Sequence, residues 1–434
     1  MSEFALIVRG REQDVAVSDG TIVARGENLS GSAATEIDGR ALTIFPGVID
    51  AHVHFNEPGR ALWEGFATGS RAAAAGGTTT VFDMPLNSHP PTIDGASFDA
   101  KRAAAEVQSL VDFGLWGGLV PGNLDELETL RDRGAVGLKA FMCNSGIDDF
   151  LFADDATLRA GMKRAAELDL LVAVHAESHE MTAALTARQH VSGKGSVRHF
   201  LDSRPIAAEL EAIRRAIALA GETGCRLHIV HVSCAAGVEL VAAALRAGVD
   251  VTCETCPHYL LLSDEDMERL GAVAKCAPPL RSRAEQQALR ACLGDVHTIG
   301  SDHSPCPWNM KEPEDFFSAW GGISSCQHLL SLLIDAAIDA ENIERLTARN
   351  VAARFRIPAK GKLALGCDAD FTLVDFGQEE ITTESLHYRH RHSPYVGRTL
   401  RARVVRTFLR GQEIFRNGSV FAQPAGRFVR PQPP

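Results

Sequence analysis

Between about residue 45 and residue 358, short apolar runs alternate with longer stretches in which apolar residues recur at helical spacing. Apolar runs of about four to eight residues are typical of buried strands, and the longer amphipathic stretches are typical of helices that cover a sheet. The alternation predicts βαβ units around a parallel sheet. The expected strands are Val48–His54, Thr78–Met84, Gly114–Val120, Val136–Phe141, Leu170–Ala176, Arg226–Val232, Asp250–Glu254 and His297–Asp302.

Eight strands with helices between them favour a (β/α)8 TIM barrel with insertions, which belongs to the α/β class. A doubly wound open sheet is the alternative. The distinction matters for function because a barrel gathers the carboxyl ends of all its strands around one mouth, where active sites lie.

The two ends of the chain have a different pattern. Residues 1–44 and 359–434 contain short β-rich runs separated by turn signals such as Asp19-Gly20 and Asn417-Gly418. We expect one small β domain built from both ends beside a catalytic barrel at 45–358, although composition leaves open whether the two ends pair. The tail from Arg427 to Pro434 is expected to be loosely ordered.

Charge and cysteine content narrow the function classes. The formal net charge is −11, which argues against nucleic acid and anionic membranes as main partners, because both require a basic surface. No apolar run approaches the roughly 18 residues of a membrane helix, and the first residues lack a signal-peptide pattern. The ten cysteines are dispersed, which is typical of free thiols in a reducing compartment. We therefore expect a soluble, cytoplasmic protein.

The first chemical signal is the pair His52 and His54 at the end of a predicted strand. Side chains alternate along a strand, so these two imidazoles point to the same face and can bind one metal ion. The pair alone is weak evidence, since polar residues are common at strand ends. Three more residues strengthen it, because each lies at the end of its own predicted strand: His175, His231 and Asp302. Imidazole nitrogen and carboxylate oxygen are common ligands of zinc and similar ions.

Lys139 is the one charged residue in the apolar run Val136–Phe141. It could be a surface lysine whose ammonium reaches water along its flexible stem. The other interpretation is a metal ligand. An ammonium cannot bind a cation, but an amine that has reacted with CO2 is a carbamate, whose two oxygens can bridge two ions. Two divalent ions bring four positive charges; the carbamate, Asp302 and a hydroxide bring three negative ones, which leaves a charge that can polarise a carbonyl.

These residues together resemble the binuclear amidohydrolase superfamily. Residues 361–370 (GKLALGCDAD) are similar to its G-x-L-x-x-G-x-D-A-D signature. The resemblance covers nearly the whole chain and implies a TIM barrel beside a β-sandwich built from both termini. It implies two divalent ions bridged by N6-carboxylated Lys139, with zinc expected first and cobalt, manganese or iron also suited to the ligands. The ligands it implies are His52 and His54 for the buried ion, His175 and His231 for the other, Lys139 for both, and Asp302 for the buried ion.

Within the superfamily, the cyclic amidohydrolases are most similar, and several segments look like the allantoinase branch: residues 54–60 (HFNEPGR), 83–87 (DMPLN), 320–323 (WGGI), 388–390 (YRH) and 393–397 (SPYVG). Dihydroorotases carry an arginine two residues after the second histidine, where this chain has Asn56, and an amide cannot clamp a carboxylate with a charged fork. The resemblance therefore implies hydrolysis of allantoin, a neutral ring, to allantoate, with Asp302 as the catalytic acid and base. Hydantoinase or dihydropyrimidinase activity on other neutral cyclic ureides is the alternative.

Candidate substrate contacts lie just after strand ends or at equivalent family positions, and a plain loop role is the alternative for each: Asn87, Asn144, Cys143, Ala277 and Gly322. The family further implies a homotetramer that uses CO2 for lysine carboxylation. A non-catalytic scaffold disagrees with the complete set of six ligands, and a serine hydrolase disagrees with the absence of a G-x-S-x-G elbow in the sequence.

Overall fold

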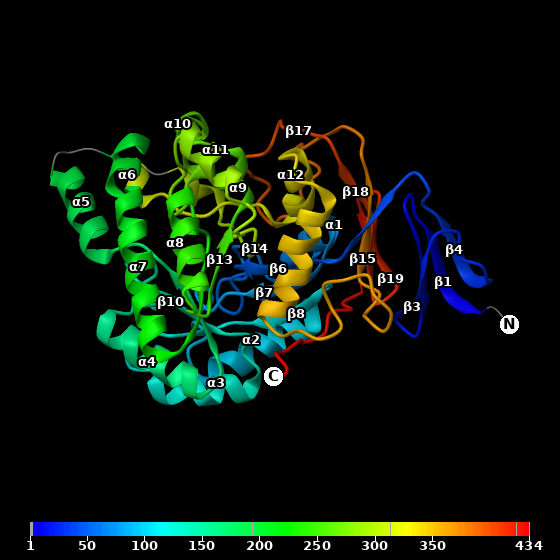
Figure 1. Ribbon diagram of the computed structural model, residues 1–434. Coiled ribbons are helices and arrows are strands. Elements are labelled where there is room, and N and C mark those ends of the chain that lie inside the picture. Colours follow the sequence, from blue (N-terminus) through cyan, green and yellow to red (C-terminus); the bar gives the residue numbers. More distant parts are fainter. Residues whose placement is uncertain (1–2, 192–194, 313, 422, 434) are drawn as a thin grey trace.

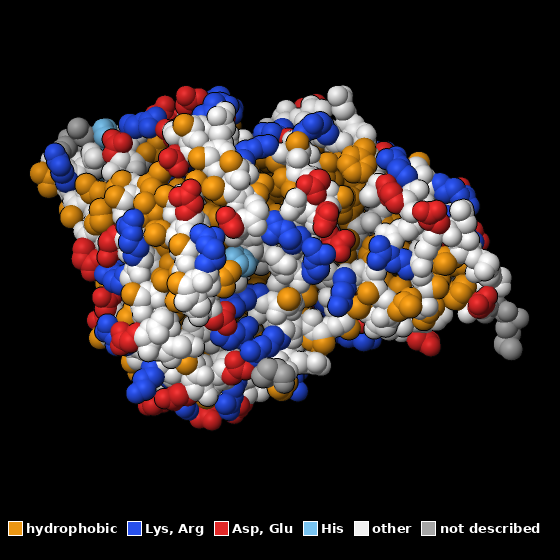
Figure 2. Space-filling model, viewed as in Figure 1, with side chains coloured by type: hydrophobic (Ala, Val, Ile, Leu, Met, Phe, Trp, Pro, Cys, Tyr) orange, Lys and Arg blue, Asp and Glu red, His pale blue; other side chains and the backbone are white. Residues whose placement is uncertain are grey.

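The computed structural model describes residues 3–191, 195–312, 314–421 and 423–433. A barrel surrounded by helices forms one part of the molecule, and a β-sandwich lies beside it (Figure 1). On the face shown in Figure 2, acidic and basic side chains are interspersed and do not separate into fields of one sign.

The barrel wall consists of parallel strands that pair in chain order. Trp116 alone separates β8 from β9, so these two strands together form the third wall position. A parallel bridge between Val53 and His303 closes the ring. The TIM barrel prediction is confirmed, and the open-sheet alternative is excluded. The strands are β6 (Val48–Val53), β7 (Thr78–Asp83), β8 (Asp112–Leu115), β9 (Gly117–Gly118), β10 (Leu138–Phe141), β11 (Leu171–His175), β12 (Arg226–Ile229), β13 (Val251–Thr255) and β14 (Thr298–Ile299).

Helices cover the outside of the barrel, and their ends follow the expected chemistry. The carboxylate of Asp154 caps α4 by accepting from the Thr157 N–H, and the left-handed Gly224 ends α7. The helices are α1 (Phe66–Ala75), α2 (Gly95–Gln108), α3 (Leu127–Arg133), α4 (Asp155–Glu167), α5 (His179–Val191), α6 (Val197–Ser203), α7 (Ile206–Thr223), α8 (Ala235–Arg246), α9 (Pro257–Leu261), α10 (Asp264–Leu270), α11 (Arg283–Ala291), α12 (Leu329–Asp335), α13 (Ala340–Glu344) and α14 (Asn350–Arg354).

The sandwich joins strands from both ends of the chain. One sheet has the order β3-β2-β1-β4 and the other β20-β19-β18-β15-β5, and β5 pairs antiparallel with β15. Apolar side chains from both sheets, such as Val8, Val15 and Phe371, form a shared core. The strands are β1 (Phe4–Arg9), β2 (Asp14–Ser18), β3 (Thr21–Gly26), β4 (Ala33–Asp38), β5 (Thr43–Pro46), β15 (Phe371–Asp375), β18 (Arg403–Leu409), β19 (Gln412–Arg416) and β20 (Ser419–Val420), and a separate hairpin pairs β16 (Glu379–Glu380) with β17 (Thr399–Leu400).

The C-terminal tail departs from the expectation of loose order. The Phe113 N–H donates to the carbonyl of Arg427 at 3.0 Å, and the Val429 N–H donates back to the carbonyl of Phe113 at 2.8 Å. The tail therefore runs beside β8 and satisfies backbone groups there. A polar, proline-containing sequence carries no periodicity that would signal such pairing.

Candidate metal centre

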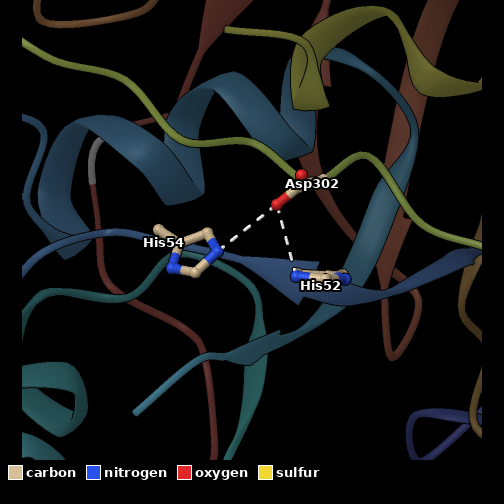
Figure 3. Close-up of side chains that lie close together, drawn as sticks. All are labelled: His52, His54 and Asp302. Carbon is tan, nitrogen blue, oxygen red and sulfur yellow. Dashed lines mark ion pairs between the residues drawn. The ribbon is translucent and has the colours of Figure 1, made fainter. Parts of the chain in front are cut away.

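His52 lies on β6, and His54 directly follows the last residue of this strand, Val53. Asp302 follows β14 and precedes His303, which forms the closing bridge to Val53. Both imidazoles point toward one carboxylate oxygen of Asp302 (Figure 3). The Nε2 atom of His52 lies 3.2 Å from Oδ1 of Asp302, and that of His54 lies 3.3 Å from the same oxygen. Burial lowers the pKa of His52 to about 3, so its ring is neutral and has a lone pair available for a metal ion.

His175 and His231 form a second pair at the ends of β11 and β12. The Nδ1 atom of His175 lies 3.1 Å from Nε2 of His231. Burial lowers the pKa of His175, but Cys143 and Glu177 outweigh it and raise that pKa to about 9. Burial lowers the pKa of His231, so its ring is neutral and Nε2 can accept a hydrogen bond from the Nδ1–H of His175. A divalent cation between the two nitrogens would take the place of that proton.

The two pairs belong to one cluster. The ring centroids of His52 and His231 lie 5.4 Å apart, and those of His175 and His231 lie 4.8 Å apart. The backbones of His231 and Asp302 both have positive φ, at 40° and 46°. Residues other than glycine rarely adopt this conformation, and strain of this kind gathers at functional sites.

Lys139 completes the cluster from β10. Its side chain is fully buried, and its Nζ atom has no hydrogen-bond partner among the described residues. Burial disfavours the ammonium and lowers the pKa of Lys139 to about 8, although Asp302 and Glu254 favour it. A surface lysine that reaches water does not fit this burial. The unpartnered nitrogen beside four histidines and a carboxylate fits a site that holds metal ions.

Two buried carboxylates that the sequence analysis did not select orient these rings. Glu254 lies 2.7 Å from Nδ1 of His52, and Glu177 lies 2.8 Å from Nε2 of His175. Each contact leaves the opposite ring nitrogen, Nε2 of His52 and Nδ1 of His175, directed into the cluster. Glu254 lies near the end of β13, so the strand-end rule that found the other residues could have found it.

The cluster opens into a cavity of about 740 Å³. All six expected ligands line this cavity, as do Asn87, Asn144 and Ala277. Cys143 is not among the lining residues; it is buried, with its thiol close to His175 and Glu177. Gly321 rather than Gly322 lines the cavity. Gly322 is buried, and its carbonyl accepts a hydrogen bond from Lys311 at 2.6 Å.

Residues 43–414 match the model of the amidohydrolase family. The chain belongs to this family. The chain is 56% identical over 448 residues to the allantoinase of Rubrobacter xylanophilus, which covers 100% of this chain and 99% of that protein. It is 52% identical to the allantoinase of Solibacter usitatus, covering 96% of this chain and 93% of that protein.

Solved structures of family members have the same fold. The L-hydantoinase (dihydropyrimidinase) from Arthrobacter aurescens superimposes with a TM-score of 0.95 at 33% identity, over 98% of this chain and 100% of that chain. The dihydropyrimidinase from Brevibacillus agri superimposes with a TM-score of 0.90 at 31% identity, over 99% of both chains. In the described part of this family member, no helix combines the length and apolar character needed to cross a membrane.

Proposed function

We propose that this protein is an allantoinase, which hydrolyses one amide bond of the allantoin ring to give allantoate. The observation that carries the proposal is the convergence of four histidines, Asp302 and an unpartnered lysine at the mouth of the barrel. The two relatives with the name allantoinase, at 56% and 52% identity over nearly the whole chain, support this substrate. The reaction belongs to allantoin degradation in purine metabolism.

The donor set suits two divalent ions, with zinc first and cobalt, manganese or iron as alternatives. His52, His54 and Asp302 would hold one ion, His175 and His231 the other, and Lys139 both, after its amine has reacted with CO2 to form a carbamate. Such ions, when bound, lower the pKa of water and polarise a carbonyl. The Nζ atom of Lys139 supports this assignment, because carboxylation removes a buried cation that has no hydrogen-bond partner among the described residues.

Asp302 is the residue that moves the proton in this proposal. Burial raises the pKa of its carboxyl group, but the neighbouring histidines outweigh burial and hold that pKa well below its usual range. The carboxylate therefore stays ionised at neutral pH and can accept a proton from the attacking water. The protonated carboxyl group then acts as a general acid: it donates this proton to the ring nitrogen that leaves as the amide carbon–nitrogen bond breaks.

The substrate contacts are proposals of the same kind. Asn87, Asn144 and Ala277 line the cavity and could bond the ring or the ureido group. The thiol of Cys143 lies close to His175. The carbonyl of Gly322 accepts a hydrogen bond from Lys311, so the group that Gly322 could offer to a substrate is its backbone N–H. Asn56 is buried with Oδ1 unpartnered, and it brings no positive charge for a substrate carboxylate. These features favour a neutral ring over dihydroorotate.

Hydantoinase activity is the second candidate, because the solved neighbours include a hydantoinase and a dihydropyrimidinase. Steady-state kinetics on allantoin, unsubstituted hydantoin, dihydrouracil and dihydroorotate separate the two. We expect the highest kcat/KM on allantoin and negligible turnover of dihydroorotate. A higher kcat/KM on hydantoin or dihydrouracil would reassign the enzyme to the alternative.

The assembly and location are proposed on separate grounds. Helix α5 buries only Thr182: Met181 and Leu185 are half-buried, and Val191 at the end of the helix is 91% exposed. This exposed apolar surface supports the homotetramer that the family implies. The ten free thiols support a reducing, cytoplasmic compartment.

A further inference from the structure

Two lysines outside the ligand cluster are buried beside the cavity. Lys275 follows the short helix η2 (Gly271–Ala274), and Lys311 ends the short helix η3 (Trp308–Lys311). Only 4% and 6% of their surfaces are exposed, respectively. No described carboxylate forms an ion pair with either ammonium, whereas Lys101 and Lys360, two other buried lysines, are each paired with carboxylates.

Backbone carbonyls take the place of carboxylates. The Nζ atom of Lys275 donates to the carbonyls of Phe316 and Phe317 at 2.8 and 2.9 Å, and to that of Ala319 at 2.6 Å. The Nζ atom of Lys311 donates to three further carbonyls, those of Ala272 at 2.9 Å, Trp320 at 2.9 Å and Gly322 at 2.6 Å. An ammonium has three N–H donors, so each lysine is fully hydrogen-bonded.

The six acceptors are concentrated in one short segment. Apart from Ala272, all belong to residues 316–322, so five of the seven carbonyls of this segment are turned toward an ammonium. Carbonyl dipoles that point at one place repel each other unless a cation stands between them. The segment contains only one short 3-10 turn, η4 (Phe316–Ser318), so regular secondary structure does not fix the rest of its conformation.

This segment forms one wall of the cavity. Its lining residues are Phe317, Ser318, Ala319, Trp320 and Gly321. The indole N–H of Trp320 donates to the carbonyl of Ser304 at 3.1 Å, and the side chain of Asn87 donates to Oγ of Ser304 at 3.5 Å. The wall is thus connected both to the loop that follows Asp302 and to a candidate substrate contact.

The two cations destabilise the folded chain when considered alone. Burial lowers the pKa of Lys275 to about 7 and that of Lys311 to about 8, and the charge of Lys311 lowers the pKa of Lys275 further. Arg204 also opposes the charge of Lys275, and Asp315 favours it. The carbonyls offset part of this cost, as do the rings of Phe200 and Phe316, whose centroids lie 4.7 and 5.2 Å from Nζ of Lys275. A buried charge without a carboxylate partner is costly even so, which sets these two lysines apart from Lys101 and Lys360.

We propose that Lys275 and Lys311 are positioning residues, which gather the carbonyls of residues 316–322 and hold this segment in the conformation that encloses the substrate. The identity of the substrate rests on the proposed function, but the effect on the segment does not. Neither lysine contacts the metal ligands in this proposal; each acts through the wall that it shapes.

The test compares Lys275→Met and Lys311→Met with Lys163→Met, a matched control at an exposed lysine of α4. Hydrogen exchange read by mass spectrometry needs no substrate. We expect amide exchange in 316–322 to accelerate by at least about tenfold in the two buried variants, because the local structure opens more often. In kinetics with allantoin, KM should rise about tenfold while kcat stays within about threefold, since the chemistry is unchanged. The control should match the parent protein in both measurements.

Rescue distinguishes a missing cation from general damage. In Lys275→Ala, the vacated space opens into the cavity, so propylammonium at millimolar concentration should restore slow exchange and part of the lost affinity. Potassium chloride at equal ionic strength is the control. This variant also serves if the methionine variants fail to fold.

Unchanged exchange and unchanged KM in all the variants would overturn the proposal, as would equal losses in kcat and in exchange across the whole chain. If allantoin is not the substrate, kinetics give no signal even for the parent protein, while the exchange result still decides the proposal.

Discussion

Two buried lysines, one at the junction of the two domains and one at the mouth of the barrel, show how differently this chain treats the same side chain. Lys360 lies within 2.8, 2.8 and 2.6 Å of carboxylate oxygens of Asp112, Asp368 and Asp370. These charges outweigh burial and raise the pKa of Lys360. Lys139 has no hydrogen-bond partner among the described residues, and burial lowers its pKa to about 8.

The difference separates a complete site from an incomplete one. At the junction, three carboxylates of the chain itself compensate the single positive charge of Lys360, and Arg410 forms a further ion pair with Asp112. At the mouth, the chain supplies ring nitrogens, the carboxylate of Asp302 and an amine, but no described residue accepts a hydrogen bond from the amine. A lowered pKa increases the fraction of neutral amine, which is the form that reacts with CO2. The account therefore adds CO2 and metal ions to the site at the mouth of the barrel, whereas the site at the junction needs no added group.

The largest expected effect is that of Lys139→Ala. Without the bridge, we expect the variant to hold fewer than two ions per chain and to lose more than about 10³-fold in kcat/KM, because the ions supply the nucleophile. Metal analysis and kinetics measure both losses. Propionate, which offers two oxygens in the vacated space, should restore part of the activity. Full activity of the variant would contradict a role of Lys139 in the centre.

Chelation should have a similar effect without a mutation. We expect metal-free protein to be inactive but folded, and to regain activity at two ions per chain, faster when bicarbonate is present. Activity is titrated against added zinc, and circular dichroism checks the fold. Recovery that is complete at one ion per chain would argue against a binuclear centre.

Lys360→Met should produce the opposite pattern. Removal of the ammonium leaves the buried carboxylates of Asp112 and Asp370 without this partner, so we expect a loss of about 3 kcal/mol in the free energy of unfolding. Urea unfolding measures the loss. The folded fraction should retain its kcat/KM, since the junction does not touch the cavity. A variant that is stable but inactive would show that the two regions are not independent.

The smallest effect is expected from Glu254→Gln. The amide keeps the size of the side chain but accepts the proton of His52 less strongly, so metal affinity should fall about 10- to 100-fold. Competition with a chromophoric chelator measures this affinity. Glu222→Gln on the exposed end of α7 is the control, and equal affinities of the two variants would exclude a role for Glu254 in orienting His52.

The sequence predicted the barrel and the polar residues that cluster at its mouth for one physical reason. Parallel strands that are buried on both faces read as apolar runs, and the polar residues at their ends stand out. This rule located His175, His231 and Asp302, and it would have located Glu254. It could not locate Lys275 and Lys311, because their partners are backbone carbonyls in an irregular segment. Every residue has a backbone carbonyl, so the residue types do not show which carbonyls bind a lysine.

Two further features escaped prediction. The tail from Arg427 pairs through its backbone with Phe113, so its side chains gave no signal. The break between β8 and β9 at Trp116 arises where the indole N–H donates to the carbonyl of Ala51 at 3.0 Å, a contact across the barrel that no local pattern specifies.

The central claim is that the residues at the mouth of the barrel bind two metal ions and that carboxylated Lys139 is a ligand of both. A crystal structure of the active, metal-loaded protein with anomalous scattering tests it most directly. The account predicts two anomalous peaks, one beside His52 and His54 and one beside His175 and His231, with density for a carboxyl group on Nζ of Lys139 between them. A single peak, or an unmodified amine in a fully active enzyme, would contradict it.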